Sequence, residues 1–206
     1  MKLFILVFLL GSPSLAAELK PGSVALTFDD GPDPKHTLQI LKILKEQNVK
    51  ATFFMLGIKA RQYPELVKAV KADGHVIANH SYNHANLAHL NANKLKYEIS
   101  ETNEILKQIT GQEPKCLRPP YGASSKEVRA VSAQAGLTVV TWDLNSFDYT
   151  NETPAKEEQW VLEKAKSGGV ILMHDALRGG AHTVVALPNI IAGYKKRGVR
   201  FDTICN

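Results

Sequence analysis

Short hydrophobic runs alternate with amphipathic stretches along most of the chain. The runs are rich in β-branched and aromatic residues, and they predict buried strands at residues 24–28, 51–56, 75–78, 115–118, 137–142, 169–173 and 200–204. The stretches between them repeat hydrophobic residues every three or four positions. They predict helices around Leu38, Leu41 and Leu44 and at residues 65–71, 93–109, 125–135, 154–166 and 184–196. This alternation predicts an α/β protein with mostly parallel strands.

Polar residues that could act as acids, bases or metal ligands follow most of the predicted strands. They are Asp29, Asp30, His80, His84, Arg118, Asp143, Asp148 and His174. The carboxyl ends of so many strands can meet only if they face a common axis, as in a barrel. An open sheet would gather mainly the loops at its switch point. We therefore expect a single-domain, irregular (β/α)7 barrel.

The amino terminus has the pattern of a secretory signal peptide. Met1 and Lys2 precede residues 3–10, which contain no polar side chain, and small residues fill positions 11–17. The hydrophobic run is far shorter than the ~20 residues that span a bilayer. We expect cleavage of residues 1–17, export to the periplasm, cell wall or medium, and no stable membrane insertion. Residues 18–206 would then form one catalytic domain of about 190 residues.

The charge distribution changes this picture little. The formal net charge is +5, and it falls to +4 when Lys2 is removed with the signal peptide. Lysines such as Lys42, Lys45, Lys68 and Lys71 are scattered over helix faces, which favours a solvated surface over nucleic-acid binding. A weak attraction to an anionic wall polymer is compatible with the sign.

The chain has two cysteines, Cys116 and Cys205. In an exported protein two cysteines suggest a disulfide, and their spacing does not suit a structural zinc site. In a barrel of sequential neighbours, however, the fourth and seventh predicted strands are not adjacent. We therefore expect the two residues to lie too far apart to pair.

Two motifs offer ligands for a metal ion. Asp29 and Asp30 leave the first predicted strand into a Gly-Pro turn, and His80 and His84 share one face if their segment is helical. Alone, the first motif also suits a loop and the second is often incidental. Together they supply one carboxylate and two imidazoles for a divalent ion such as Zn²⁺, with a second carboxylate free to act as a base.

Two later motifs complete the chemistry. Arg118 opens a Pro-Pro turn whose stiff backbone could aim a peptide N–H at a developing oxyanion. His174 ends a hydrophobic strand, and an acidic partner would raise its pKa and keep it protonated near neutral pH. Asp148 and the adjacent Asp175 are both candidates for that partner. We interpret Asp143 as a loop or capping acid.

In combination and in order, these motifs resemble those of the polysaccharide deacetylases of carbohydrate esterase family four, which include chitin and peptidoglycan de-N-acetylases. The resemblance covers residues 24–204. It implies one divalent metal held by Asp30, His80 and His84, with Asp29 as general base and His174 as general acid. It also implies support from Arg118, Asp148 and Tyr121, through its backbone N–H, and substrate contacts from Tyr121, Tyr149 and Leu172. Asn145 and Tyr149 depart from the family pattern, which has Asp and Trp at these positions.

The resemblance implies a secreted hydrolase that removes N-acetyl groups from a polysaccharide containing N-acetylglucosamine, such as peptidoglycan or chitin oligomers. An O-acetyl esterase acting on xylan would use the same residues. A non-enzymatic module that binds cell-wall glycans would be expected to have lost the base, a ligand or the acid, and all are present. Zn²⁺ is the favoured ion and a monomer the favoured state. The polymer and the oligomeric state stay open.

Overall fold

The computed structural model describes residues 19–20, 22–150, 152–164 and 169–206; the predicted signal peptide, 1–17, lies outside these residues. Eight strands form one parallel sheet in the order β5-β4-β3-β2-β1-β7-β6, with β8 paired to the start of β1. The strands are β1 (Ser23–Asp29), β2 (Thr52–Met55), β3 (Val76–Asn79), β4 (Cys116–Leu117), β5 (Thr138–Val139), β6 (Leu144–Asn145), β7 (Val170–His174) and β8 (Arg200–Asp202).

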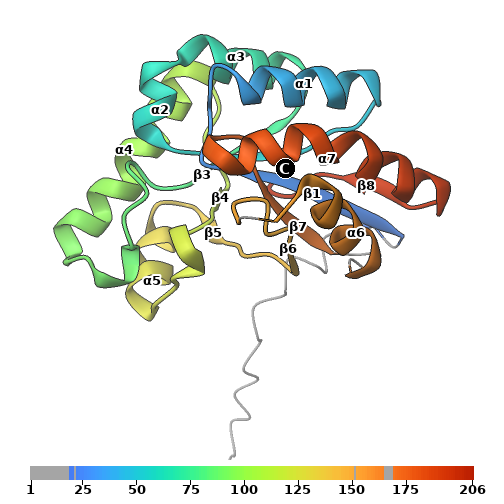
Figure 1. Cartoon of the computed structure of the whole chain (residues 1–206). Coiled ribbons are helices and arrows are strands. Elements are labelled where there is room, and N and C mark those ends of the chain that lie inside the picture. The colour runs from blue at the N-terminus through green and yellow to red at the C-terminus, as the bar shows by residue number, and fades with distance from the viewer. Residues whose placement is uncertain (1–18, 21, 151, 165–168) are drawn as a thin grey trace, which may run out of the picture.

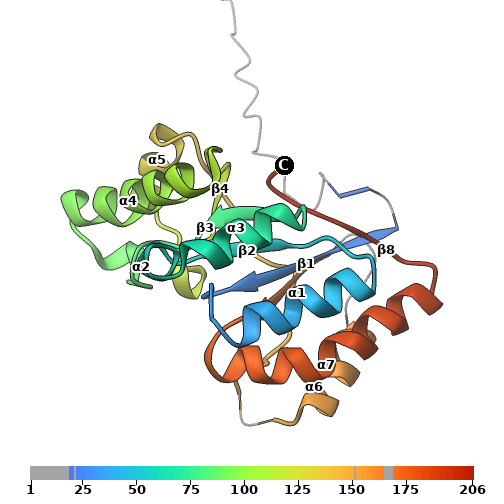
Figure 2. The ribbon, with the colours of Figure 1, turned by 90° about the horizontal axis from the view of Figure 1, so that it is seen from above.

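Helices surround this curled sheet (Figure 1). They are α1 (His36–Glu46), α2 (Gly57–Gln62), α3 (Pro64–Ala72), α4 (Ala92–Thr110), α5 (Lys126–Gln134), α6 (Pro154–Lys164) and α7 (Leu177–Lys196), with short 3-10 helices η2 (Leu87–His89) and η3 (Pro120–Gly122). Figure 2 shows α1 beside α7, whereas α4 and α5 lie together at the opposite end of the molecule. Among the described helices none is long and apolar enough to cross a membrane.

The two faces of β1 show how the sheet orients the site. Val24, Leu26 and Phe28 belong to the larger core cluster, which also contains residues of α1, α3 and α7. Ala25 belongs to a second cluster together with residues of β2, β3, β4 and β7. Because side chains alternate along a strand, Thr27 and Asp29 share the face of Ala25. Asp29 therefore points into the barrel at the carboxyl end of β1.

The predicted irregular, parallel α/β barrel is confirmed, with local differences. Within the described residues no pairing joins β5 to β6, so the barrel stays open there. The sheet has one strand more than predicted, because the two-residue strand β6 pairs with β7. Helix α2 was also not predicted, and α7 begins earlier than the predicted 184. These elements are too short, or too rich in glycine, to show a hydrophobic period.

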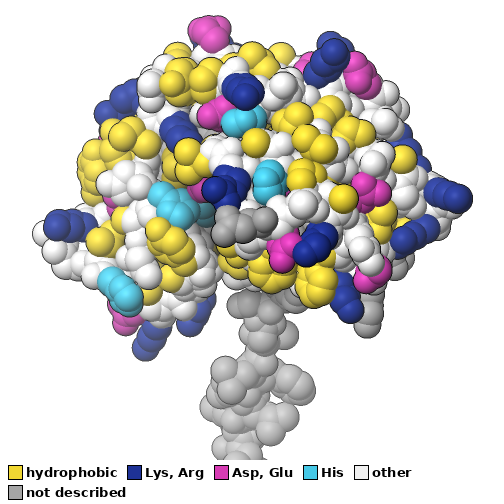
Figure 3. All heavy atoms as spheres, in the orientation of Figure 1, with side chains coloured by type: hydrophobic (Ala, Val, Ile, Leu, Met, Phe, Trp, Pro, Cys, Tyr) yellow, Lys and Arg dark blue, Asp and Glu magenta, His cyan; other side chains and the backbone are white. Residues whose placement is uncertain are grey.

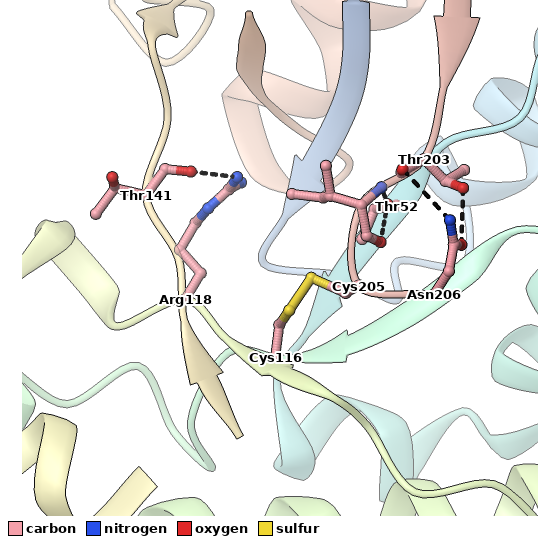
Figure 4. Close-up of a disulfide and its surroundings, with 8 residues drawn as sticks. Thr52, Cys116, Arg118, Thr141, Thr203, Cys205 and Asn206 are labelled. Carbon is pink, nitrogen blue, oxygen red and sulfur yellow. Dashed lines mark hydrogen bonds between the residues drawn. A yellow bond between two sulfur atoms is a disulfide. The ribbon is translucent and has the colours of Figure 1, made fainter. Parts of the chain in front are cut away.

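The expectation that Cys116 and Cys205 stay unpaired is wrong. Their sulfur atoms form a disulfide with the Cα atoms 5.6 Å apart (Figure 4). The prediction considered only strand adjacency, but the chain continues past β8 across the amino end of β2. There the Thr52 hydroxyl donates to the carbonyl of Ile204 and accepts from its N–H. This crossing carries Cys205 to the start of β4.

Candidate active site

The carboxyl end of β1 presents two aspartates to the barrel interior. Asp29 is 2% exposed and is the last residue of the strand. Asp30 follows with φ at 75°, in the left-handed region that non-glycine residues seldom adopt. This turn of the backbone lets both carboxylates face the imidazole of His80. Asp29 Oδ2 lies 3.7 Å and Asp30 Oδ1 3.4 Å from its Nε2 atom.

Arg118 holds Asp29 from the side of β4. Its guanidinium donates to Asp29 Oδ1 at 2.7 Å and to the Thr27 hydroxyl at 2.8 Å. The side chain is fully buried and stacks on the ring of Phe54, with the guanidinium carbon 4.0 Å from the ring centre. Burial lowers the pKa of Arg118 and the charge of Asp29 opposes that shift. The pair fixes the orientation of the Asp29 carboxylate.

His80 and His84 lie on a loop, not on a helix as considered above. The loop turns sharply, with φ of 69° at Ser81 and 66° at His84. The Nδ1 atom of His80 lies 2.7 Å from the carbonyl oxygen of Arg118. It must donate there, so the Nε2 lone pair is free to face Asp30. The Nδ1 atom of His84 lies 3.2 Å from the Tyr121 hydroxyl.

This set of atoms fits a divalent metal ion. One ligand atom from each of Asp30, His80 and His84 lies within 4.8 Å of the others. Asp30 Oδ1 is buried, has no hydrogen-bond partner among the described residues and lies 3.2 Å from His84 Nε2. Burial raises the pKa of Asp30, but His80, His174 and His84 together outweigh it and the pKa falls below its ordinary value. Converging lone pairs around an unsatisfied oxygen call for a cation, and an oxygen with two imidazole nitrogens suits Zn²⁺.

His174 faces the same cavity from the end of β7. Its Nδ1 atom donates to Asp148 Oδ1 at 2.7 Å, and its backbone N–H donates to Asp148 Oδ2. Burial alone would lower the pKa of His174, but the hydrogen bond and charge of Asp148 raise it to about 9. Asp175, the other candidate partner, accepts from the hydroxyl of Thr37 instead. The geometry thus pairs His174 with Asp148.

One cavity of about 530 Å³ lies at the carboxyl ends of the strands, and its lining includes Asp29, Asp30, His80, His84 and His174. Tyr121 and Tyr149 stand at its rim, 69% and 48% exposed, while Leu172 lies deep in its wall at 4%. On the face seen in Figure 3, histidines reach the surface beside exposed hydrophobic side chains. Lysines and arginines are spread over the same face without forming a patch. The cavity offers apolar walls around a polar, ionisable floor.

The cavity wall also contains residues that had not been singled out as site residues, among them Trp142, Leu177 and Gly179. The ring centre of Trp142 lies 5.8 Å from the guanidinium carbon of Arg118. Leu177 and Gly179 lie in the first turn of helix α7. A Cβ atom on Gly179 would lie 2.8 Å from the Cβ of His174, so glycine is required for this close approach. The sequence pattern places Trp142 at the end of the predicted strand 137–142 and gives it no role in the site. Nothing in the sequence pattern marks Leu177 or Gly179.

Comparisons with known proteins find matches over most of this chain. The family model described as polysaccharide deacetylase matches residues 16–140. A peptidoglycan-N-acetylglucosamine deacetylase from Bacillus cereus is 41% identical over 182 residues, covering 88% of this chain and 66% of the relative. A chitooligosaccharide deacetylase from Azorhizobium caulinodans is 35% identical, covering 85% of this chain and 90% of the relative. The crystal structure of the Bc1960 peptidoglycan N-acetylglucosamine deacetylase superposes with a TM-score of 0.85 at 40% identity, covering 89% of this chain and 86% of that one.

Proposed function

The chain belongs to the polysaccharide deacetylase family, and on that premise we propose that it is a metal-dependent hydrolase that removes N-acetyl groups from a glycan containing N-acetylglucosamine. One observation carries the proposal. The metal-binding set of Asp30, His80 and His84 opens into a cavity that Asp29 and His174 also line. A deacetylase needs a base and an acid near the reacting amide, and these two residues are in hydrogen-bonded environments that suit those roles.

We assign the role of general base to Asp29. A divalent ion bound beside it, with Zn²⁺ favoured, would polarise the amide carbonyl and acidify a water molecule. Asp29 is oriented by Arg118, which leaves its Oδ2 atom directed toward the proposed metal ligands. It would take the proton from the attacking water. The backbone N–H of Tyr121, at the cavity rim, would donate to the oxygen that becomes negatively charged.

We assign the role of general acid to His174. Its Nδ1–H is held by Asp148, so its Nε2–H is the proton available to the leaving amine. A pKa of about 9 keeps that proton in place at neutral pH. Leu172 would form the wall against the acetyl methyl group, and Tyr149 would offer its ring to a sugar face.

The names of the relatives support an N-acetylated glycan as substrate, since they are peptidoglycan and chitooligosaccharide deacetylases. The polymer itself is not specified by the residues of the cavity. We also propose that the protein is exported, because such polymers lie outside the cytoplasm and residues 1–17 have the signal-peptide pattern.

The test is release of acetate by the purified protein from chitin oligomers, from peptidoglycan and from acetylated xylan. We expect release from the first two that stops with a chelator and returns with Zn²⁺. Asp29→Asn should lower the rate by about 10²–10⁴-fold. Faster release from xylan would favour the esterase alternative. A metal-loaded protein that binds the oligomers and releases no acetate would overturn the enzymatic proposal.

A further inference from the structure

The loop between His80 and His84 is held on two sides by different helices. On one side the first N–H groups of α2 donate to it, from Gly57 to the carbonyl of Ser81 at 3.0 Å and from Ile58 to that of Tyr82 at 2.9 Å. On the other side it faces α4. Helices α2 and α4 are in contact, as Figures 1 and 2 both show.

The contact with α4 is made by one buried carboxylate. Glu98 is 5% exposed, and its Oε2 atom accepts from the backbone N–H of Tyr82 at 2.8 Å and of Asn83 at 3.1 Å. Both donors belong to the three residues between the two imidazoles. Glu98 therefore satisfies two backbone N–H groups of the loop.

A second residue fixes where the loop leaves the sheet. The amide nitrogen of Asn79, at the end of β3, donates to the carbonyl of Ile99 on α4, and its amide oxygen accepts from the N–H of Ser81. Helix α4 thus anchors both the start and the middle of the loop. Anchoring is needed because Ser81 and His84 have positive φ, a conformation that persists only when its surroundings enforce it.

We propose that Glu98 is a positioning residue of the metal site. By holding the N–H groups of Tyr82 and Asn83, it keeps the loop in the shape that turns the Nε2 atoms of His80 and His84 toward Asp30. It touches neither the ion nor the substrate. The inference rests on the proposed function for the metal, but its effect on the loop can be measured in the metal-free protein.

Three substitutions separate positioning from other roles. Glu98→Ala removes the acceptor, Glu98→Gln keeps an oxygen acceptor at the same reach without charge, and Glu98→Asp keeps the charge one methylene short. A positioning role predicts that Gln retains function and that Asp and Ala lose it. A role of charge alone, acting on the ion through space, predicts the reverse order for Gln and Asp. Glu104→Ala, an exposed glutamate on the same helix, is the matched control.

The first measurement is amide hydrogen exchange in the metal-free protein. Exchange at Tyr82 and Asn83 should be faster in Glu98→Ala than in the wild type, near wild type in Glu98→Gln, and unchanged in Glu104→Ala. Slow exchange at both amides in a folded Glu98→Ala variant would overturn the proposal. If Glu98→Ala does not fold, the Gln and Asp variants decide by their order.

The second measurement is affinity for Zn²⁺ by competition with a chromophoric chelator. We expect a loss of about tenfold or more in Glu98→Ala and Glu98→Asp, as for residues that orient metal ligands, and less than about threefold in Glu98→Gln. Wild-type affinity for Zn²⁺ in a folded Glu98→Ala protein would overturn the positioning role of Glu98 but would leave the proposed metal site intact. Absence of zinc binding by the wild type overturns the metal site itself, and the inference with it.

Discussion

At the scale of single residues, two buried side chains near Asp148 respond to its charge. His174 donates a hydrogen bond to Asp148, and this bond together with the charge of Asp148 outweighs burial and raises the pKa of His174 to about 9. Glu157 on α6 is 4% exposed, and neither of its carboxylate oxygens has a partner among the described residues. Burial first, and then the charge of Asp148, raises the pKa of Glu157 to about 8. The same carboxylate thus favours a protonated imidazole and a protonated carboxyl.

The His174 shift makes activity and stability depend on pH. An imidazole with a raised pKa stabilises the fold fully below pH 6.5, and that stabilisation is lost as the pH rises through about 9. If His174 is the general acid, the rate falls over the same alkaline range. We expect Asp148→Asn to move this alkaline limb down by one pH unit or more. The measurement is a pH–rate profile for acetate release, and an unmoved limb would count against the His174–Asp148 pairing as the source of the acid.

Glu157 should oppose folding at neutral pH. Its pKa is raised from 4.5 to about 8, so there is no penalty below pH 4.5 and a growing one as the pH rises toward 8. Glu157→Gln should therefore stabilise the protein by about 2–3 kcal/mol at pH 7 and by little at pH 4.5. Urea unfolding at the two pH values measures this. Glu163→Gln, exposed on the same helix, should show no such difference.

At the scale of elements, the turn after β1 is packed directly against the segment after β7. The Asp175 carboxylate is fully buried and accepts from the Thr37 hydroxyl at 2.6 Å, and the same hydroxyl oxygen accepts from the N–H of Asp33 at 2.8 Å. Gly31 lies against Asp175 so closely that a Cβ atom would be 2.1 Å from its Oδ2 atom. The turn that carries Asp30 is therefore fixed by contacts with β7 and α1.

Gly31→Ala should be strongly destabilising. The added methyl has no space, and Asp175 cannot retreat without losing its bond to Thr37, so we expect a loss of about 3 kcal/mol together with weaker zinc binding. Gly111→Ala, at the end of α4, meets nothing within 4 Å and suffers only from its positive φ, which costs about 1 kcal/mol. Unfolding free energies of the two variants test this. Equal losses would contradict the steric argument.

The elements that the sequence predicts well are those with a strong hydrophobic period. β1, β2 and β7 are continuous buried runs, and the polar residues at the carboxyl ends of β1 and β7 do gather at one rim. Helix α2 and strand β6 have too few residues for a period to appear. The loop at His80 depends on positive φ values and on Glu98, a helix residue with no motif around it. Such tertiary contacts leave no mark in a single sequence.

At the scale of the whole molecule, the disulfide joins distant parts of the chain. Cys116 and Cys205 are 89 residues apart in sequence, and the bond ties the segment after β8 to the start of β4. The prediction missed it because strand order alone says nothing about where the chain runs after its last strand. Since Thr52 also forms hydrogen bonds with Ile204, this segment is attached to the amino ends of both β2 and β4.

Reduction should therefore destabilise the protein substantially. Loop-closure entropy for a separation of 89 residues corresponds to about 4.6 kcal/mol. We expect the urea midpoint to fall in dithiothreitol, and a Cys116→Ser, Cys205→Ser double variant to match the reduced protein and to ignore the reductant. A midpoint that reductant leaves unchanged in the wild type would contradict the expected contribution.

Arg118 contacts two residues of the site, one through its side chain and one through its backbone. Its guanidinium holds Asp29, and its backbone carbonyl holds His80. A displacement of β4 would therefore carry the proposed base, Asp29, and the proposed metal ligand, His80, along together, and the spacing between them would be preserved. The spacing left to vary is that to His174, which is borne by β7. Relative motion of β4 and β7 would thus mainly change the distance between Asp29 and His174, between which the substrate amide is proposed to bind.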